Sequence, residues 1–98
     1  MTLIKDPEQN ETKHLHKTVD FTGKRVLEIG CGEGRLTWQY ASASFSTIGL
    51  DPDKDSLRVA TIDRPSDMDN KIYFANAQAE HIPFENETFD IAILAWSL

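Results

Sequence analysis

The sequence predicts an α/β fold built around a parallel sheet. Four apolar segments have strand character, and the first two are each followed by a helical pattern; they span residues 25–29, 46–50, 71–75 and 89–95. Strands that alternate with helices form parallel sheets through right-handed crossovers. With 98 residues, 40% of them hydrophobic and 27% charged, the chain has the length and composition of one small globular domain.

Residues 1–20 are expected to form a polar N-terminal arm, and residues 21–98 the folded domain. The arm carries few large apolar side chains, so we expect it to be frayed, with one or two helical turns at most. His14 and His16 lie in this arm, but no further ligands are evident beside them. We therefore expect no metal site.

The segment 25–36, RVLEIGCGEGRL, reads as a buried strand, a tight turn and the start of a helix. Without a Cβ atom, Gly30, Gly32 and Gly34 allow a sharp reversal, close approach of a ligand and close packing of the next helix. The N–H groups at that helix start then face the same crevice. A dinucleotide fingerprint has the spacing G-x-G-x-x-G, whereas here the third glycine comes one position early and is followed by Arg35. This spacing argues against pyrophosphate binding.

The helix after the turn is expected to pack on the sheet through Leu36, Tyr40 and Ala43, which share one helical face. Trp38 lies off this face, and we expect for it a second packing partner outside the chain. The sole cysteine, Cys31, stands between two glycines of the turn. A small side chain suits that position, so packing explains Cys31 better than nucleophilic chemistry does.

Asp51 follows the second strand directly and has two interpretations. It can cap the next helix, with Pro52 as the first helical residue and the helix running to about Ile62. It also comes about 20 positions after Gly30, the distance at which an acidic residue accepts ribose hydroxyls in dinucleotide-binding folds. The spacing favours the ribose, and the helix cap stays open as the alternative.

Three segments together resemble the class I S-adenosylmethionine (SAM) dependent methyltransferases. The run Glu28-x-Gly30-x-Gly32-x-Gly34 is similar to their motif I, and residues 78–84, QAEHIPF, resemble their stretch Asp-Ala-x-x-Leu-Pro-Phe. The resemblance extends from about Val26 to the end of the chain. It implies a Rossmann-like sheet in the order 3-2-1-4, flanked by helices and truncated after the fourth strand.

The resemblance also implies a set of site residues. Around the methionine portion of SAM it places Glu28, Gly30, Cys31, Gly32 and Gly34, at the ribose Asp51 with Pro52, and at the adenine Gln78 with Ala79. Gln78 replaces the family's Asp; its amide oxygen can accept from the adenine amino group, but without charge the contact is weaker. Leu50 and Ile82 are either apolar contacts of the adenine ring or ordinary core.

The implied activity is methyl transfer from SAM, which leaves S-adenosylhomocysteine, to an acceptor that resembles those of the small-molecule branch. No catalytic residue is identified, and little acid–base chemistry is needed, because positioning alone can supply ~7–11 kcal/mol of the barrier. Three alternatives stay open: a module that binds SAM without turnover, half of a nicotinamide oxidoreductase, and a structural piece without ligand.

Charge and hydropathy limit the partners and the location. The net charge of −6 disfavours nucleic acid. No apolar run is long enough to span a membrane and no secretion signal is visible, so we expect a cytoplasmic protein. The segment Ile91–Trp96 is expected to be an open apolar edge of an incomplete sheet, and hence a surface for self-association.

Overall fold

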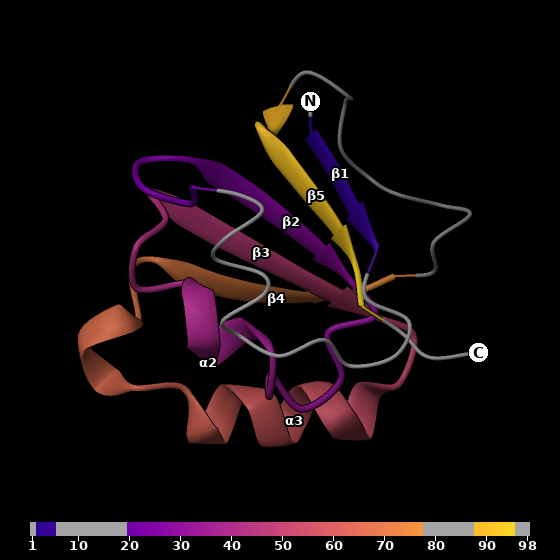
Figure 1. Cartoon of the computed structure of the whole chain (residues 1–98). Coiled ribbons are helices and arrows are strands. Elements are labelled where there is room, and N and C mark those ends of the chain that lie inside the picture. Colours follow the sequence, from indigo (N-terminus) through magenta and orange to yellow (C-terminus); the bar gives the residue numbers. More distant parts are fainter. Residues whose placement is uncertain (1, 6–19, 78–87, 96–98) are drawn as a thin grey trace.

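The computed structural model describes residues 2–5, 20–77 and 88–95, and these form a five-stranded parallel sheet (Figure 1). The strand order is β1-β5-β2-β3-β4. The strands are β1 (Thr2–Lys5), β2 (Arg25–Ile29), β3 (Ser46–Asp51), β4 (Ile72–Asn76) and β5 (Ile91–Leu94). The four strands expected from the sequence are β2 to β5, and their order 3-2-1-4 is confirmed.

Two helices lie on the same side of the sheet, as Figure 1 shows. They are α2 (Thr37–Tyr40) and α3 (Lys54–Asp63), followed by the 3-10 turn η1 (Ser66–Met68). Right-handed crossovers from β2 to β3 and from β3 to β4 advance in one direction along the sheet, so both helices must fall on one face.

The alternation of side chains along the strands divides the core into two clusters. On the helix side the buried members are Phe21, Val26, Tyr40, Ala41, Ile72, Ile91 and Ile93. The opposite cluster consists of Leu27, Ile29, Leu50 and Phe89. Within the first cluster, the rings of Phe21 and Tyr40 stack with centroids 4.7 Å apart. This contact holds α2 against Phe21, which lies just before β2.

A buried carboxylate ties β2 to α2. Glu28 is fully buried, and its Oε1 atom accepts hydrogen bonds of 2.7 Å from both the Thr37 and Tyr40 hydroxyls. Burial and the neighbouring Glu28 raise the pKa of Tyr40 well above its usual value, so the phenol keeps its proton and donates. The tie spans the glycine turn, because Glu28 precedes that turn and its two donors follow it.

Helix α2 is shorter than its sequence pattern suggests. It ends at Tyr40, and Ala43, expected on the buried face, is exposed. The Ser44 hydroxyl and its N–H both donate to the Ala41 carbonyl, at 2.7 and 3.1 Å, and the Ala43 N–H bonds Tyr40 three residues back. These contacts tighten the chain and end the helix.

The N-terminal segment also departs from expectation. Thr2–Lys5 do not belong to a frayed arm but form β1, which pairs in parallel with β5 from Thr2↔Ile91 to Lys5↔Leu94. Strand β5 is therefore paired on both sides, and the expected open edge at residues 91–94 is wrong. Self-association loses that basis and stays an untested prediction.

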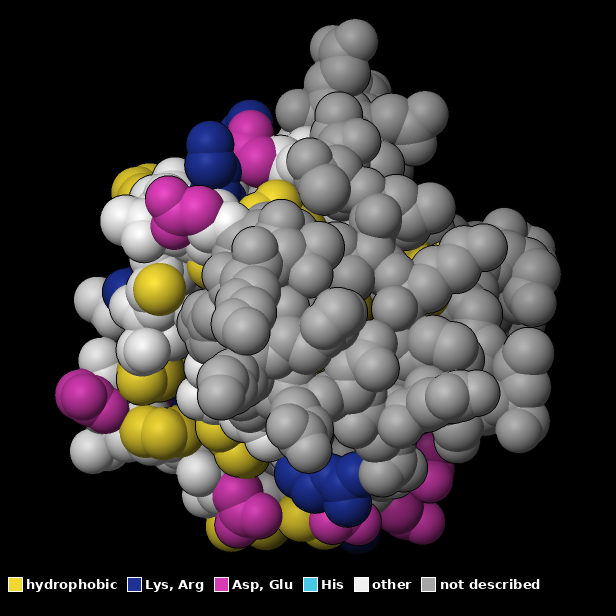
Figure 2. All heavy atoms as spheres, viewed as in Figure 1, with side chains coloured by type: hydrophobic (Ala, Val, Ile, Leu, Met, Phe, Trp, Pro, Cys, Tyr) yellow, Lys and Arg dark blue, Asp and Glu magenta, His cyan; other side chains and the backbone are white. Residues whose placement is uncertain are grey.

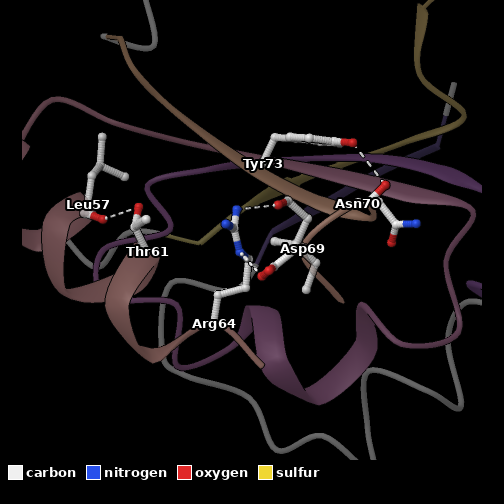
Figure 3. A network of polar contacts seen from close by, with 7 residues as sticks. Leu57, Thr61, Arg64, Asp69, Asn70 and Tyr73 are labelled. Carbon is white, nitrogen blue, oxygen red and sulfur yellow. Dashed lines mark hydrogen bonds and ion pairs between the residues drawn. The ribbon is translucent and has the colours of Figure 1, made fainter. Parts of the chain in front are cut away.

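Polar contacts hold the connection between α3 and β4 (Figure 3). The Arg64 Nε atom lies 3.1 Å from Asp69, and its Nη1 donates to the Ile72 carbonyl at 2.9 Å. The Tyr73 hydroxyl donates to the Asn70 carbonyl at 2.9 Å. Arg64 thus bridges the end of the helix and the start of β4, which is an edge strand with β3 as its one neighbour in the described sheet.

The buried tie between β2 and α2 predicts a loss of stability when one hydroxyl is removed. Tyr40→Phe keeps the ring stack but deletes a bond to a buried carboxylate, so we expect the free energy of unfolding to fall by about 1.5–3 kcal/mol in urea titrations. Tyr73→Phe is the matched control, because the Tyr73 side chain is 47% exposed and the loss should be much smaller. Equal losses in the two variants contradict this role of Glu28.

A second prediction concerns the starts of β2 and β5. The Asp90 carboxylate accepts from the Arg25 side chain and from the Arg25 N–H, the latter at 2.9 Å, and these bonds hold the pKa of Asp90 below its usual value. A lowered carboxyl pKa stabilises the fold above the unfolded value of about 4, and this contribution is lost as the pH falls through the folded value.

We therefore expect Asp90→Asn to be less stable than the wild type at pH 7, with the difference shrinking toward pH 2–3. Urea midpoints measured across this range give the comparison. Asp67→Asn, on the exposed turn η1, controls for the loss of one surface charge. If the difference in urea midpoint between Asp90→Asn and the wild type stays constant with pH, the Arg25 contact is not its cause.

Candidate functional site

The three glycines after β2 form a left-handed turn. Gly30, Gly32 and Gly34 have φ angles of 84°, 56° and 90°, which are strained for any residue with a Cβ. The N–H groups of Gly30 and Cys31 both donate to the Leu50 carbonyl, at 2.7 and 3.1 Å. The turn is thereby fixed to the carboxyl end of β3, the neighbouring strand.

The Asp51 carboxylate lies at this turn. Its Oδ2 atom accepts from the Gly32 N–H at 2.8 Å, and its Oδ1 atom accepts from the Asp53 N–H at the same distance. A carboxylate has about four lone-pair positions, and these bonds use one on each oxygen. One acceptor position on each oxygen can therefore serve a ligand.

The helix-cap alternative for Asp51 is wrong. Asp53 caps α3, because its side chain accepts from the N–H groups of Asp55 and Ser56 at 3.0 and 3.5 Å and from the Ser56 hydroxyl at 3.0 Å. These bonds lower the pKa of Asp53. Pro52 lies in the exposed bend before α3 and is not a helical residue. The Asp51 carboxylate is instead directed to the glycine turn.

Two of the glycines face different surroundings. A Cβ atom built on Gly32 meets nothing within 4 Å, whereas one on Gly34 lies 2.5 Å from Cζ2 of Trp38. The side of Gly32 is therefore open to a ligand. Gly34 serves the close approach of α2, the role expected for the third glycine. Trp38 has its partner within the chain, not outside it: its ring meets Phe74 edge-on with centroids 5.8 Å apart.

Cys31 is a packing residue at the base of the turn. It is buried, and its Sγ atom lies close above Gly49 in β3. Burial raises the pKa of the thiol, and the charges of Glu28 and Asp51 raise it further. The thiol therefore stays protonated at neutral pH, which agrees with packing and not with nucleophilic chemistry.

Two expectations about the turn are not met. Glu28 was expected beside the methionine portion of the ligand, but it has no exposed surface and bonds to α2. Its buried position on the helix face of β2 explains the difference. The helix start expected directly after the glycines is also absent, since α2 begins at Thr37 and is a single turn long.

The remaining candidates divide between core and undescribed segments. Leu50 is 1% exposed and packs in the cluster opposite the helices, so its side chain is core while its carbonyl holds the turn. Gln78, Ala79 and Ile82 lie outside the described residues. The sequence-based prediction gave Gly49 in β3 no role, although a lone glycine within a strand indicates the close approach of another group.

The described residues contain neither a membrane-spanning helix nor a cluster of metal ligands. Among them, no helix is both long and apolar enough to cross a bilayer. Within the same ranges, no group of three or more His, Cys, Asp and Glu side chains is arranged to hold a metal ion.

Comparison with known proteins gives consistent matches. A model of a methyltransferase domain family matches residues 26–98. The chain is 32% identical over 95 residues to a phthiotriol/phenolphthiotriol dimycocerosates methyltransferase of Mycobacterium leprae, covering 90% of the chain and 33% of that protein. It is 37% identical over 70 residues to a ubiquinone biosynthesis O-methyltransferase of Aliivibrio fischeri, covering 70% of the chain and 30% of that protein.

A solved structure shares the fold. The crystal structure of the YcgJ protein from Bacillus subtilis superposes with a TM-score of 0.75 at 28% identity, covering 83% of this chain and 35% of that one. The chain spans about a third of the length of the curated relatives that it matches. Since the family model covers most of the sequence, including the glycine turn and Asp51, the chain belongs to the methyltransferase domain family, whose methyl donor is S-adenosylmethionine.

Proposed function

We propose that this chain is the cofactor-binding part of an enzyme that transfers a methyl group from SAM to a small-molecule acceptor. The observation that carries the proposal is the Asp51 carboxylate, held at the glycine turn by the Gly32 N–H. The site residues Gly30, Gly32 and Asp51 meet at the carboxyl ends of β2 and β3, where open α/β sheets bind their ligands.

The described residues fit a nucleoside joined to an amino acid. Asp51 keeps one acceptor position on each oxygen, which suits the two hydroxyls of a ribose. The open side of Gly32 leaves room for the methionine portion beside the sugar. We assign Glu28 to the support of α2 and not to contact with the ligand, because it is fully buried.

The chain's own residues contribute by holding geometry. When bound, SAM supplies a sulfonium methyl group that is already a strong electrophile. The Leu50 carbonyl fixes the start of the turn, Asp51 fixes Gly32, and Trp38 fixes Gly34. A site held in this way places the donor accurately for in-line attack, and positioning is the main requirement of such a reaction.

The geometry disfavours the nicotinamide alternative. In dinucleotide-binding turns, backbone N–H groups bind the pyrophosphate. Here the Gly32 N–H already donates to a carboxylate, so a pyrophosphate meets a negative charge at the turn. The positively charged sulfonium of SAM is attracted by the same charge.

Two observations favour a small-molecule acceptor. The curated relatives reported above are named for phthiotriol dimycocerosates and for ubiquinone biosynthesis, and neither name refers to a protein or a nucleic acid. The chain also has a net charge of −6, although Figure 2 shows Lys and Arg side chains among the acidic ones along the lower rim, where α3 lies in Figure 1. A net negative charge repels nucleic acid on average.

The proposal predicts ligand selectivity for the chain itself. SAM and S-adenosylhomocysteine should each raise the thermal midpoint, because a ligand that binds only the folded state stabilises it, and NADH at equal concentration should not. Differential scanning fluorimetry gives the comparison. Stabilisation by NADH without stabilisation by SAM contradicts the assignment, and a radiolabel assay with candidate acceptors then separates binding from turnover.

The role of Asp51 predicts a loss of affinity on neutralisation. Asp51→Asn keeps the shape and an acceptor for the Gly32 N–H, but weakens the bonds to the ribose, and we expect SAM to bind about 10–100-fold more weakly by calorimetry. Asp55→Asn, which removes the same charge from the exposed first turn of α3, should bind like the wild type. Unchanged affinity in Asp51→Asn places the ribose elsewhere.

A further inference from the structure

We propose that Phe74, on the edge strand β4, is a positioning residue that helps to hold the glycine turn (residues 30–34) in place. The role concerns the ligand site assigned above and therefore rests on the proposed function. Phe74 is far from the glycine motif in sequence, and β4 is separated from β2 by the whole width of β3. Besides the pairing of β4 with β3, side-chain contacts link Phe74 to the turn.

The first link lies above Gly49, where Phe74 and Cys31 border the same space. In the sheet register, Gly49 is the partner of Glu28 on one side and of Phe74 on the other, so the three residues form one row across the sheet. A Cβ atom on Gly49 lies 2.8 Å from the Cys31 Sγ atom and 2.9 Å from Phe74 Cδ1. The space left by the missing side chain is thus filled by Cys31 and Phe74 together.

The second contact runs through Trp38. The ring of Phe74 meets that of Trp38 edge-on, with an interplanar angle of 87°, and the Trp38 ring lies against Gly34. Phe74 therefore supports the turn on both sides of Gly32, through Cys31 before it and through Trp38 after it. Gly32 is the residue whose N–H bonds Asp51.

These contacts connect the edge strand to the ligand site. Packed side chains transmit displacement because interiors have few voids. A smaller residue at position 74 leaves Cys31 and Trp38 without their common neighbour, and the turn then samples more conformations. Ordering a looser turn on binding costs affinity, since preorganisation lowers the entropy lost by the bound site.

The test compares two substitutions on one strand. In Phe74→Leu we expect SAM to bind about tenfold more weakly by calorimetry. In the same variant without ligand, the hydrogen-exchange rate of the Gly32 amide, divided by that of the Leu27 amide in the centre of β2, should be at least about fivefold higher than in the wild type. Tyr73→Leu is the matched control, because Tyr73 is the next residue, points to the opposite face and is 47% exposed. It should leave both quantities near their wild-type values.

A second comparison uses the shared space above Gly49. Gly49→Ala alone forces Cys31 and Phe74 apart and should weaken SAM binding. Combined with Phe74→Leu, the added methyl group fills part of the volume that the ring vacates, so the double variant should bind better than the product of the two single losses predicts.

The outcomes separate this proposal from the proposed function. If the wild type fails to bind SAM, the functional assignment fails, while exchange at Gly32 in the ligand-free variants still tests the support by Phe74. If Phe74→Leu and Tyr73→Leu change SAM affinity and Gly32 exchange equally, Phe74 only stabilises its strand and the proposal is overturned. Unchanged exchange and affinity in Phe74→Leu overturn it as well.

Discussion

The hydrogen bond from the Gly32 N–H to the Asp51 carboxylate joins the two segments on which the site depends. One segment is the turn after β2, and the other is the end of β3, which returns beside β2 through a right-handed crossover. The Leu50 carbonyl adds two bonds to the same junction. Residues about 20 positions apart therefore act as one unit.

The same bond gives the turn its electrostatic character. The Gly32 N–H, which would bind phosphate in a dinucleotide fold, here donates to the Asp51 carboxylate. Burial raises the pKa of Cys31, and the nearby carboxylates of Glu28 and Asp51 raise it further. Such a turn favours a cation over an anion. It also keeps the Cys31 thiol protonated, which disfavours a nucleophilic role for this residue.

The sequence was sufficient for the features that depend on local pattern. The apolar runs located β2 to β5, and the alternating glycines with Asp51 located the junction. The features that it missed are set by contacts between distant residues. Asp51 bonds to the Gly32 N–H across the sheet and not to α3, Glu28 is buried with the Thr37 and Tyr40 hydroxyls as its donors, and β1 forms by pairing with β5. No local propensity encodes such pairings.

The second and third glycines of the motif have different surroundings. The space where a Gly32 side chain would lie is open. The corresponding space at Gly34 is occupied by the ring of Trp38, which in turn packs against Phe74 on the edge strand. We infer that the Asp51 carboxylate binds the ribose while it keeps its hydrogen bond from the Gly32 N–H. A crystal structure of the chain with SAM tests it most directly. We expect both ribose hydroxyls to lie on the Asp51 oxygens with the bond to Gly32 intact. A nucleoside bound elsewhere, or a carboxylate rotated away from the glycine turn, excludes this role of Asp51.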